Sequence, residues 1–326
     1  MDNLLSPALE LLPPDISAWR QGRGPDSDGP GGAIDYVQSF DSGRPGPLVL
    51  VTALVHGNEL CGAIALDRLL REGLRPEAGR LALAFVNVAA FERFTRAAPH
   101  ASRCLDEDLN RLWAPDILDG ARHSQELARA RRLRPLVDRA DFLLDLHSMS
   151  SATEPLILSG LTDKALDLAV ALGRPATIVR DGGHAAGLRL RDYGAFADPA
   201  SPRNALLVEC GQHLAPASAE VAVDVTLRFL VAVGSISAAR AAAHGRLRCA
   251  HPPRVIEVTE RVTAASDRFV FAEPFRGLDV VPRAGTVIAF DGGGRVVTPY
   301  DDCILVMPVA RPQAGHTAVR LGRERR

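Results

Sequence analysis

The chain has 326 residues, 47% of them hydrophobic, so it can form one large core with a smaller domain or two comparable domains. Its formal net charge is -1, so the chain lacks the large excess of basic residues that most nucleic-acid-binding proteins have. We therefore expect no nucleic-acid partner. No apolar run reaches the roughly 18 residues that a membrane span needs, so we expect no membrane association.

The five cysteines are widely spaced and include no C-x-x-C pair, which favours free thiols in a reducing compartment. The N-terminal stretch MDNLLSPALELLPPD contains apolar residues, but Pro7 and the pair Pro13-Pro14 interrupt any secretory signal. We therefore expect a cytoplasmic protein. The oligomeric state stays open, a homo-oligomer included.

Five short apolar segments predict strands that are buried on both faces of a parallel sheet. These are residues 47–55, 81–88, 142–146, 176–180 and 205–209. Helical patterns fall between or after them, at residues 59–73, 162–173 and 217–234. The alternation predicts an α/β fold with a mixed, mostly parallel sheet flanked by helices.

The arginine-rich segment 122–140 predicts a helix with a solvated charged face, which Pro135 is expected to kink or restart. From residue 246 onward the pattern changes to strand-like segments separated by turns, without a long helical pattern. We therefore predict two domains, an α/β domain over residues 1–245 and a small all-β domain over residues 246–326.

Two polar motifs follow predicted strands, at the sheet edge where open α/β folds bind ligands. His56 and Glu59 lie in VTALVHGNELCG, and His147 lies at the end of FLLDLHS. Two imidazoles and a carboxylate would supply the three protein ligands of a hydrolytic zinc site. Either motif alone is more often a polar turn at a sheet edge, but the two strand ends together favour a metal site.

A third strand end carries Glu209, in ALLVECG. A carboxylate beside a metal-bound water can act as a general base and then pass the proton to a leaving amine. An ordinary ion pair with an arginine is the alternative for Glu209. The segment RCLDEDLNR holds Arg103, Asn110 and Arg111, and a guanidinium group can bind a carboxylate or stabilise an oxyanion. A solvated loop is the alternative there.

The motifs HGNE, RCLDEDLNR, DLHS and LVECG, in this order over residues 45–215, closely resemble those of the succinylglutamate desuccinylase/aspartoacylase family, which is related to zinc carboxypeptidases. The resemblance implies a zinc-carboxypeptidase-like catalytic domain, and the β-rich tail resembles the C-terminal domain of that family. It also implies a zinc-dependent amidohydrolase with one Zn²⁺ per chain, which removes the acyl group from an N-acyl amino acid or a related small N-acyl amine.

The resemblance also implies a role for each matching residue. His56, Glu59 and His147 match the zinc ligands, and Glu209 matches the general base. Arg103 matches the residue that polarises the scissile carbonyl group. Asn110 and Arg111 match the residues that bind the substrate carboxylate.

Two departures from the family pattern argue against aspartate-type specificity. Aspartoacylases carry a further substrate-binding arginine ten residues before the catalytic glutamate, where this chain has Pro199, and Arg203 is out of register. Tyr300 is the candidate for a tyrosine of the C-terminal domain that aspartoacylases use, but its surroundings are typical of a structural strand and turn. The glycine-rich segment 180–199, which includes Arg191, is either a specificity lid or a surface loop.

Two other functions stay open. A carboxypeptidase-like metallopeptidase would use the same metal on short peptides. A carrier or other non-catalytic binding protein is suggested by the strand-turn rhythm of the C-terminal part, which resembles biotinyl and lipoyl domains. However, residues 246–326 contain no lysine that could carry such a group, because the only lysine in the chain is Lys164.

Overall fold

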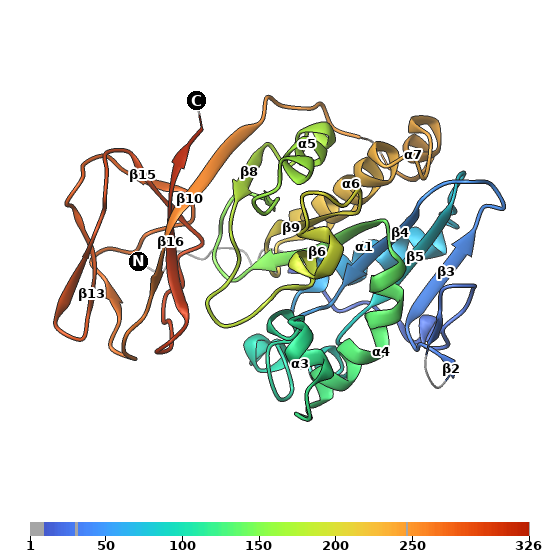
Figure 1. The fold of residues 1–326 in the computed structure, drawn as a ribbon, viewed down its shortest axis with the longest axis horizontal. Helices are drawn as coiled ribbons and strands as arrows, with labels where there is room; N and C mark the ends of the chain where they lie inside the picture. Colours follow the sequence, from blue (N-terminus) through green and yellow to red (C-terminus); the bar gives the residue numbers. More distant parts are fainter. Residues whose placement is uncertain (1–9, 30–31, 246, 326) are drawn as a thin grey trace, which may run out of the picture. The chain divides into compact units, whose positions relative to one another are not determined.

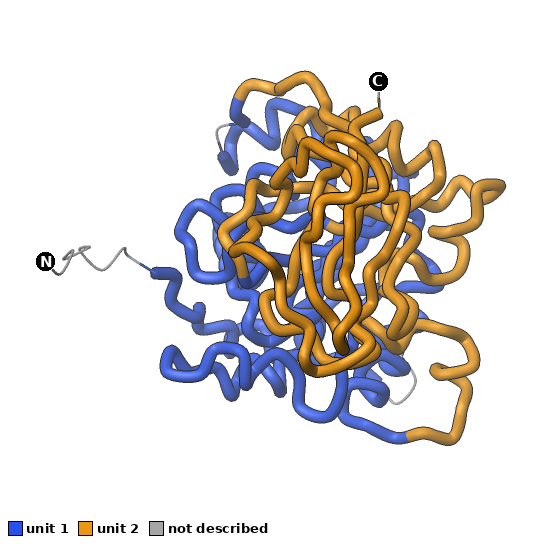
Figure 2. The backbone as a smooth tube through the Cα atoms, turned by 90° about the vertical axis from the view of Figure 1, so that its left-hand side faces the viewer, with its two compact units in different colours: residues 1–109, 123–150, 208–248 blue, residues 110–122, 151–207, 249–326 orange. Residues whose placement is uncertain are grey.

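The computed structural model describes residues 10–29, 32–245 and 247–325 (Figure 1). The chain forms two compact units, of which unit 1 comprises residues 1–109, 123–150 and 208–248, and unit 2 comprises residues 110–122, 151–207 and 249–326 (Figure 2). Residues 1–9 of the N-terminal stretch and residue 246, the first of the predicted all-β domain, lie outside the described residues. The predicted division after residue 245 therefore stays a prediction.

Unit 1 contains a mostly parallel sheet. Its strand order is β3-β5-β4-β6-β9, with β3 (Val37–Asp41), β4 (Leu48–Ala53), β5 (Arg80–Phe85), β6 (Phe142–Met149) and the second part of β9 (Asn204–Gln212). β4 runs parallel to both β5 and β6, whereas the edge strand β3 is antiparallel to β5. All residues of β4 are buried, as predicted for a strand covered on both faces.

Unit 1 also contains α-helices and a small antiparallel strand pair. They are α1 (Leu60–Arg71), α2 (Val88–Phe91), α4 (Gln125–Arg139), α6 (Pro216–Ala232), α7 (Ala238–His244) and the pair of β1 (Asp28–Gly29) and β2 (Gly32–Ala33). α1 packs against α6, and both contact β6. α1 ends where predicted because Gly73 adopts a φ of 75° and its N–H donates to the Leu70 carbonyl, while the Leu74 N–H donates to the Leu69 carbonyl.

α4 corrects two expectations for the arginine-rich segment. The helix continues through Pro135 and does not restart there, because buried apolar neighbours such as Leu136 offset the hydrogen bond that proline removes; the predicted kink stays a prediction. Nor is its charged face wholly solvated. Arg129 donates to the carbonyl groups of Asp35, Phe85 and Val86, and burial lowers the pKa of Arg129 to about 10.

Unit 2 combines a short parallel part with antiparallel strands. Its strand order is β9-β7-β8-β10-β16-β15-β12, with β7 (Leu156–Leu158), β8 (Thr177–Arg180), β10 (Arg254–Thr263), β12 (Asp279–Val281), β15 (Cys303–Val306) and β16 (Thr317–Glu324). β8 is parallel to β7 and to β10, and the pairs after β10 are antiparallel. A separate antiparallel sheet contains β11 (Val270–Phe271), β13 (Val287–Asp291) and β14 (Gly294–Val297), and the helices are α3 (Pro115–Asp119) and α5 (Asp163–Leu172).

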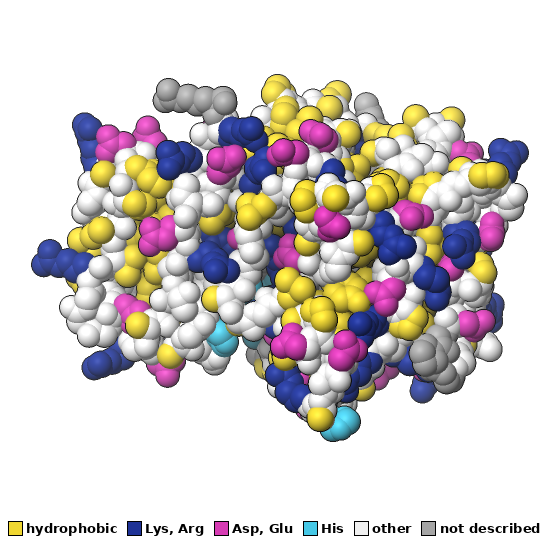
Figure 3. All heavy atoms as spheres, viewed as in Figure 1, with side chains coloured by type: hydrophobic (Ala, Val, Ile, Leu, Met, Phe, Trp, Pro, Cys, Tyr) yellow, Lys and Arg dark blue, Asp and Glu magenta, His cyan; other side chains and the backbone are white. Residues whose placement is uncertain are grey.

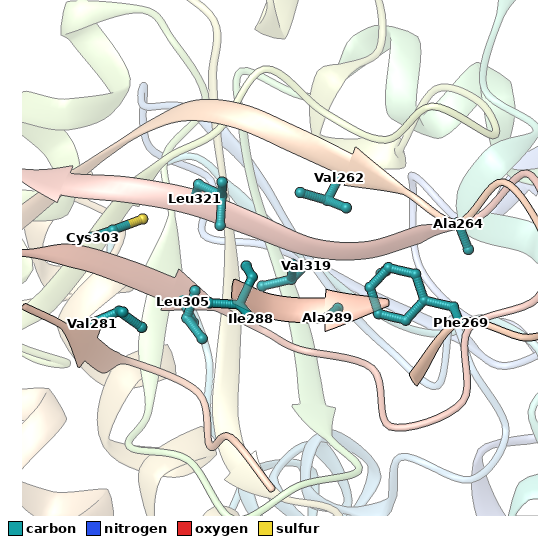
Figure 4. Close-up of a cluster of buried hydrophobic side chains, with 11 residues drawn as sticks. Val262, Ala264, Phe269, Val281, Ile288, Ala289, Cys303, Leu305, Val319 and Leu321 are labelled. Carbon is teal, nitrogen blue, oxygen red and sulfur yellow. The ribbon is translucent and has the colours of Figure 1, made fainter. Parts of the chain in front are cut away.

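The β-rich part of unit 2 has its own apolar core (Figure 4). The core residues come from β10, β12, β13, β15, β16 and the loops between them, and include Val262, Phe269, Val281, Ile288, Leu305, Val319 and Leu321. Tyr300 packs against this core, and its hydroxyl lies 2.6 Å from the Thr259 hydroxyl. These contacts agree with the structural reading of Tyr300.

The surface charges, the helix lengths and the cysteines bear on the expectations from composition. Charged side chains of both signs are interspersed over the face shown in Figure 3. Among the described residues, no helix has the length and apolar character of a membrane span. All five cysteines lie in the described ranges and are free thiols. The cytoplasmic location stays a prediction.

Candidate metal and catalytic site

A turn after β4 brings His56 and Glu59 together. Leu54, directly after the strand, adopts a φ of 60°, which is unusual for a residue other than glycine and turns the chain sharply. The Glu59 N–H then donates to the His56 carbonyl, at 3.1 Å. Glu59 occupies the N-cap position of α1, but its side chain makes no cap hydrogen bond. Instead its Oε1 lies 2.7 Å from Nδ1 of His56.

Gly57 allows this turn to lie against another segment of the site. A Cβ atom at Gly57 would lie 2.4 Å from both the Phe91 nitrogen and the Ser102 oxygen, so a larger residue would displace backbone atoms. The Gly57 N–H also donates to the carbonyl of Arg103, at 3.1 Å. The turn is thus tied directly to the segment that carries Arg103.

His147 of β6 completes a buried three-residue cluster. Its Nδ1 lies 2.9 Å from Oε2 of Glu59, and one ligand atom from each of His56, Glu59 and His147 falls within 4.8 Å of the others. The Ser148 N–H also donates to Oε2 of Glu59, at 3.0 Å. The three side chains are almost fully buried. The structure thus brings together the residues that the sequence predicts as metal ligands.

The second ring nitrogen of each imidazole contacts a carboxylate. Nε2 of His56 lies 2.9 Å from Oδ1 of Asp108, and Nε2 of His147 lies 2.8 Å from Oδ2 of Asp145. The Thr52 hydroxyl in turn donates to Oδ1 of Asp145, at 2.6 Å. Histidines that bind metals usually donate their second N–H to such a group, which fixes the tautomer and the ring orientation.

Sequence reasoning missed both carboxylates. Asp145 lies two residues before His147 on the same strand, so strand alternation places both side chains on one face of the sheet. That spacing in DLH was a usable signal. Asp108 was hidden among several other charged residues in RCLDEDLNR, where spacing alone does not single it out.

The electrostatics of the cluster suit a divalent cation. Burial raises the pKa of Glu59, but the positive charges of His56 and His147 outweigh burial and hold that pKa well below its usual range. Burial lowers the pKa of His147, but Asp145 and Glu59 raise it well above the usual value. A cation bound to both Nδ1 atoms and to Glu59 would replace protons there. The donor set therefore fits zinc.

Asp145 is expected to strengthen zinc binding without touching the ion. Asp145→Asn keeps the side-chain shape but removes the negative charge that holds His147. We expect zinc affinity to fall by about 10- to 100-fold, because an outer carboxylate contributes on this scale. Competition with a chromophoric chelator measures the zinc affinity of the variant. Unchanged zinc affinity would show that Asp145 does not act on zinc through His147.

Arg103 lies at the edge of the cluster. Its Nη2 donates to Oδ2 of Asp108, at 2.8 Å, and its Nη1 lies 3.6 Å from Oε1 of Glu59. The side chain remains 37% exposed. The guanidinium group is therefore close to the candidate ligands, on a side chain that is partly exposed.

The side chain of His147 lies on the face of β6 opposite to the face that packs on α1. A Cβ atom on Gly62 of α1 would lie 3.0 Å from the Cβ of Leu146, so Leu146 faces this helix. Because neighbouring strand residues point to opposite faces, Asp145 and His147 face the other side of the sheet.

Glu209 faces the same side by the same reasoning. It lies on β9, the neighbour of β6 in the strand order, and is 6% exposed. The thiol of Cys210 interacts with the thiol of Cys61 in α1, so Cys210 faces this helix; burial and this contact raise the pKa of Cys210 well above its usual value. Glu209 therefore lies on the face of β9 opposite to α1, as His147 does on β6. Its predicted role as general base stays a prediction.

Asn110 and Arg111 belong to unit 2 and contact other residues of that unit. The buried Oδ1 of Asn110 accepts a hydrogen bond from the Leu190 N–H, at 2.8 Å, and Nη1 of Arg111 donates to the Asn110 carbonyl, at 2.7 Å. Their predicted role in binding the substrate carboxylate stays a prediction.

The segment 180–199 is anchored within unit 2. Arg191 is buried, and its Nη2 donates to the carbonyl groups of Ser159 and Ala205, at 2.8 and 3.0 Å. Arg189 is also buried, and its Nη1 donates to Oδ2 of Asp181, at 2.9 Å. These contacts give Arg191 a structural role and favour a fixed loop over a lid.

His213 is a buried histidine of unit 1 outside the cluster. Its Nδ1 lies 2.8 Å from the Ser148 hydroxyl, and burial lowers its pKa from 6.5 to about 4. The unfolded chain therefore binds a proton at this residue between these pH values, whereas the folded chain does not. The neutral state of His213 therefore contributes free energy of unfolding above pH 6.5, and this contribution is lost as the pH falls toward 4.

His213→Asn should flatten this pH dependence. We expect the wild type to lose about 3 kcal/mol more stability than the variant between pH 6.5 and pH 4. Urea unfolding with a chelator present measures this difference without competition between protons and metal. Parallel stability curves for the two proteins would contradict the assignment.

Comparison with known proteins identifies the family. A family model described as the succinylglutamate desuccinylase/aspartoacylase catalytic domain matches residues 45–225. The chain belongs to this family. The match confirms the resemblance predicted from the motifs, and it includes the three cluster residues, Arg103 and Glu209. A comparison with curated protein sequences gives no match.

Solved structures share the fold of the family member described here. A succinylglutamate desuccinylase/aspartoacylase from Rhodobacter sphaeroides is 20% identical, with a TM-score of 0.62 over 90% of each chain. A succinylglutamate desuccinylase from Vibrio cholerae is 16% identical, with a TM-score of 0.65 over 89% of this chain and 86% of the other. The product-bound ectoine utilization protein EutE (DoeB) from Ruegeria pomeroyi is 17% identical, with a TM-score of 0.61 over 97% and 93%. These similarities confirm the predicted fold class.

Proposed function

We propose that this protein is a zinc-dependent amidohydrolase that cleaves the amide bond of an N-acyl amino acid or a related small N-acyl amine. The observation that carries the proposal is the convergence of Nδ1 of His56 and Nδ1 of His147 on Glu59, with a carboxylate holding Nε2 of each ring. Three protein ligands suit a catalytic zinc, because a structural zinc normally has four.

The proposed reaction assigns one task to each residue. A bound zinc ion would supply Lewis-acid activation of the water and of the amide carbonyl. Glu209 would accept the proton of the attacking water and deliver it to the leaving nitrogen. Arg103 would donate hydrogen bonds to the carbonyl oxygen as negative charge develops there. The carbon–nitrogen bond breaks, and a carboxylate and a free amine leave.

Binding of the substrate carboxylate is assigned to Asn110 and Arg111, because arginine can bind a carboxylate through two parallel hydrogen bonds. Pro199 stands where aspartoacylases carry a further arginine, so we do not assign aspartate as the amine product. Neighbours of known structure are named as succinylglutamate desuccinylases, which supports testing succinyl groups.

A substrate panel tests the proposal. Zinc-loaded protein is incubated with acetylated, succinylated and formylated amino acids and diamines, and with short peptides, while release of free amine is measured. We expect turnover of at least one N-acyl compound, faster than any peptide and abolished by a chelator. Hydrolysis of peptides alone would assign the protein as a peptidase, and hydrolysis of nothing in the panel would contradict the proposal.

A further inference from the structure

Glu126 binds three consecutive backbone amides of the segment that follows Arg103. Its Oε1 accepts hydrogen bonds from the Leu105 N–H, at 2.6 Å, and from Nδ2 of Asn87, at 3.1 Å. Its Oε2 accepts from the N–H groups of Asp106 and Glu107, at 3.1 and 3.4 Å. Glu126 is fully buried near the start of α4, so a single buried carboxylate accepts hydrogen bonds from all four donors.

A second contact joins the same two segments in the opposite direction. The Gln125 N–H, at the start of α4, donates to Oδ2 of Asp106, at 2.8 Å. Each segment thus supplies a carboxylate to the backbone of the other. The contacts with the amides of residues 105–107 fix the conformation of this segment relative to α4, because amides that lose a buried acceptor are costly.

The fixed segment lies between two residues of the site. Arg103 precedes it, with Nη1 3.6 Å from Oε1 of Glu59, and Asp108 follows it, with Oδ1 2.9 Å from Nε2 of His56. Glu126 lies outside the sequence motifs that predict the site, as one charged residue of an arginine-rich helix.

We propose that Glu126 is a positioning residue of the hydrolytic site, which holds Arg103 and Asp108 in place by binding the amides of residues 105–107. This inference rests on the proposed function. Glu126 acts through the backbone and does not touch the substrate.

Glu126→Gln is the most informative variant because it keeps the size of the side chain. A carboxylate accepts hydrogen bonds at both oxygens, whereas an amide has one accepting oxygen and an NH₂ group that donates. The NH₂ group of the new side chain would therefore face backbone N–H groups, and it cannot accept hydrogen bonds from them. The matched control is Asp26→Asn, since Asp26 is another buried carboxylate of unit 1, paired with Arg80 at the start of β5 and outside the sequence motifs of the site.

The experiment has two readouts, and the control variant shows how much of each change a general loss of stability would cause. Hydrogen exchange of the full-length protein should speed up in the peptide covering residues 103–111 of Glu126→Gln, and not there in Asp26→Asn. The value of kcat should fall about tenfold, on the scale of groups that orient a catalytic site. The same substitution is then made in Arg103→Ala. There we expect log kcat to fall by less than half as much, because part of the effect of Glu126 depends on the position of Arg103.

The outcomes separate this proposal from the proposed function. Unchanged exchange over residues 103–111 would overturn the role of Glu126, and an equal fall in kcat with and without Arg103 would overturn its action through Arg103. If the wild type hydrolyses no compound of the panel, the proposed function fails, and a positioning role in hydrolysis fails with it. Faster exchange confined to residues 103–111 of Glu126→Gln would still show that Glu126 holds the amides of residues 105–107. If Glu126→Gln does not fold, Asp106→Ala removes only the exposed contact with Gln125, and it should give smaller changes of the same kind.

Discussion

Replacing Glu209 with glutamine is expected to lower kcat by about 10²- to 10⁴-fold while zinc content stays at one ion per chain. Glutamine preserves the size of the side chain but cannot accept the proton of the attacking water. Because the proposed ligands are His56, Glu59 and His147, removing the charge of Glu209 leaves the ligand set intact. Steady-state kinetics on the best substrate of the panel, with zinc measured by mass spectrometry, tests this expectation.

Glu220→Gln is the control for this experiment. Glu220 lies on the exposed surface of α6, which follows β9 in unit 1, so the same chemical change there should leave both kcat and zinc content unaltered. Full turnover by Glu209→Gln would exclude Glu209 as the general base. Loss of zinc from that variant would instead place Glu209 among the ligands.

His147→Ala should lose both zinc and activity. An imidazole ligand contributes directly to the binding energy, so we expect affinity to fall by more than the about 10- to 100-fold that loss of an outer carboxylate causes. The substitution also leaves Asp145 and Glu59 buried without the cationic partner between them, which costs about 3–5 kcal/mol in comparable buried pairs. His147→Gln is therefore made in parallel, since it retains a hydrogen-bond donor at this position.

Zinc titration with a competing chelator, together with circular dichroism, separates loss of metal from loss of fold. His244→Ala is the control, because His244 is another buried histidine of unit 1, paired with Glu72 outside the cluster. We expect this control to bind one zinc ion. Wild-type zinc affinity in folded His147→Ala or His147→Gln would show that His147 is not a ligand.

The central strands were predictable because burial on both faces leaves a continuous apolar run in the sequence. The runs near residues 47–55 and 142–146 became β4 and β6, and the polar residues after or near their ends met in the cluster. The short strand β7 and the antiparallel edge strand β3 were missed. β3 has polar residues such as Gln38 at buried positions, so its pattern does not resemble that of an apolar strand.

The ligands were easier to predict than the residues that hold them. Histidine and glutamate at strand ends are rare enough to suggest a site, whereas Asp108 and Glu126 occur among many charges. Their contacts depend on long-range packing, as Glu126 shows by binding amides about 20 residues away along the chain. Pro135 shows the same effect in a helix, because buried neighbours offset the loss of one hydrogen bond.

The most direct test of the proposed zinc site is a crystal structure of the zinc-loaded protein, with the ion located by anomalous scattering at the zinc absorption edge. We expect one zinc ion bound by Nδ1 of His56, Nδ1 of His147 and the carboxylate of Glu59, at about 2.0–2.2 Å. Zinc at another place, or zinc held through Nε2 of either histidine, would contradict the arrangement from which the proposed function is derived.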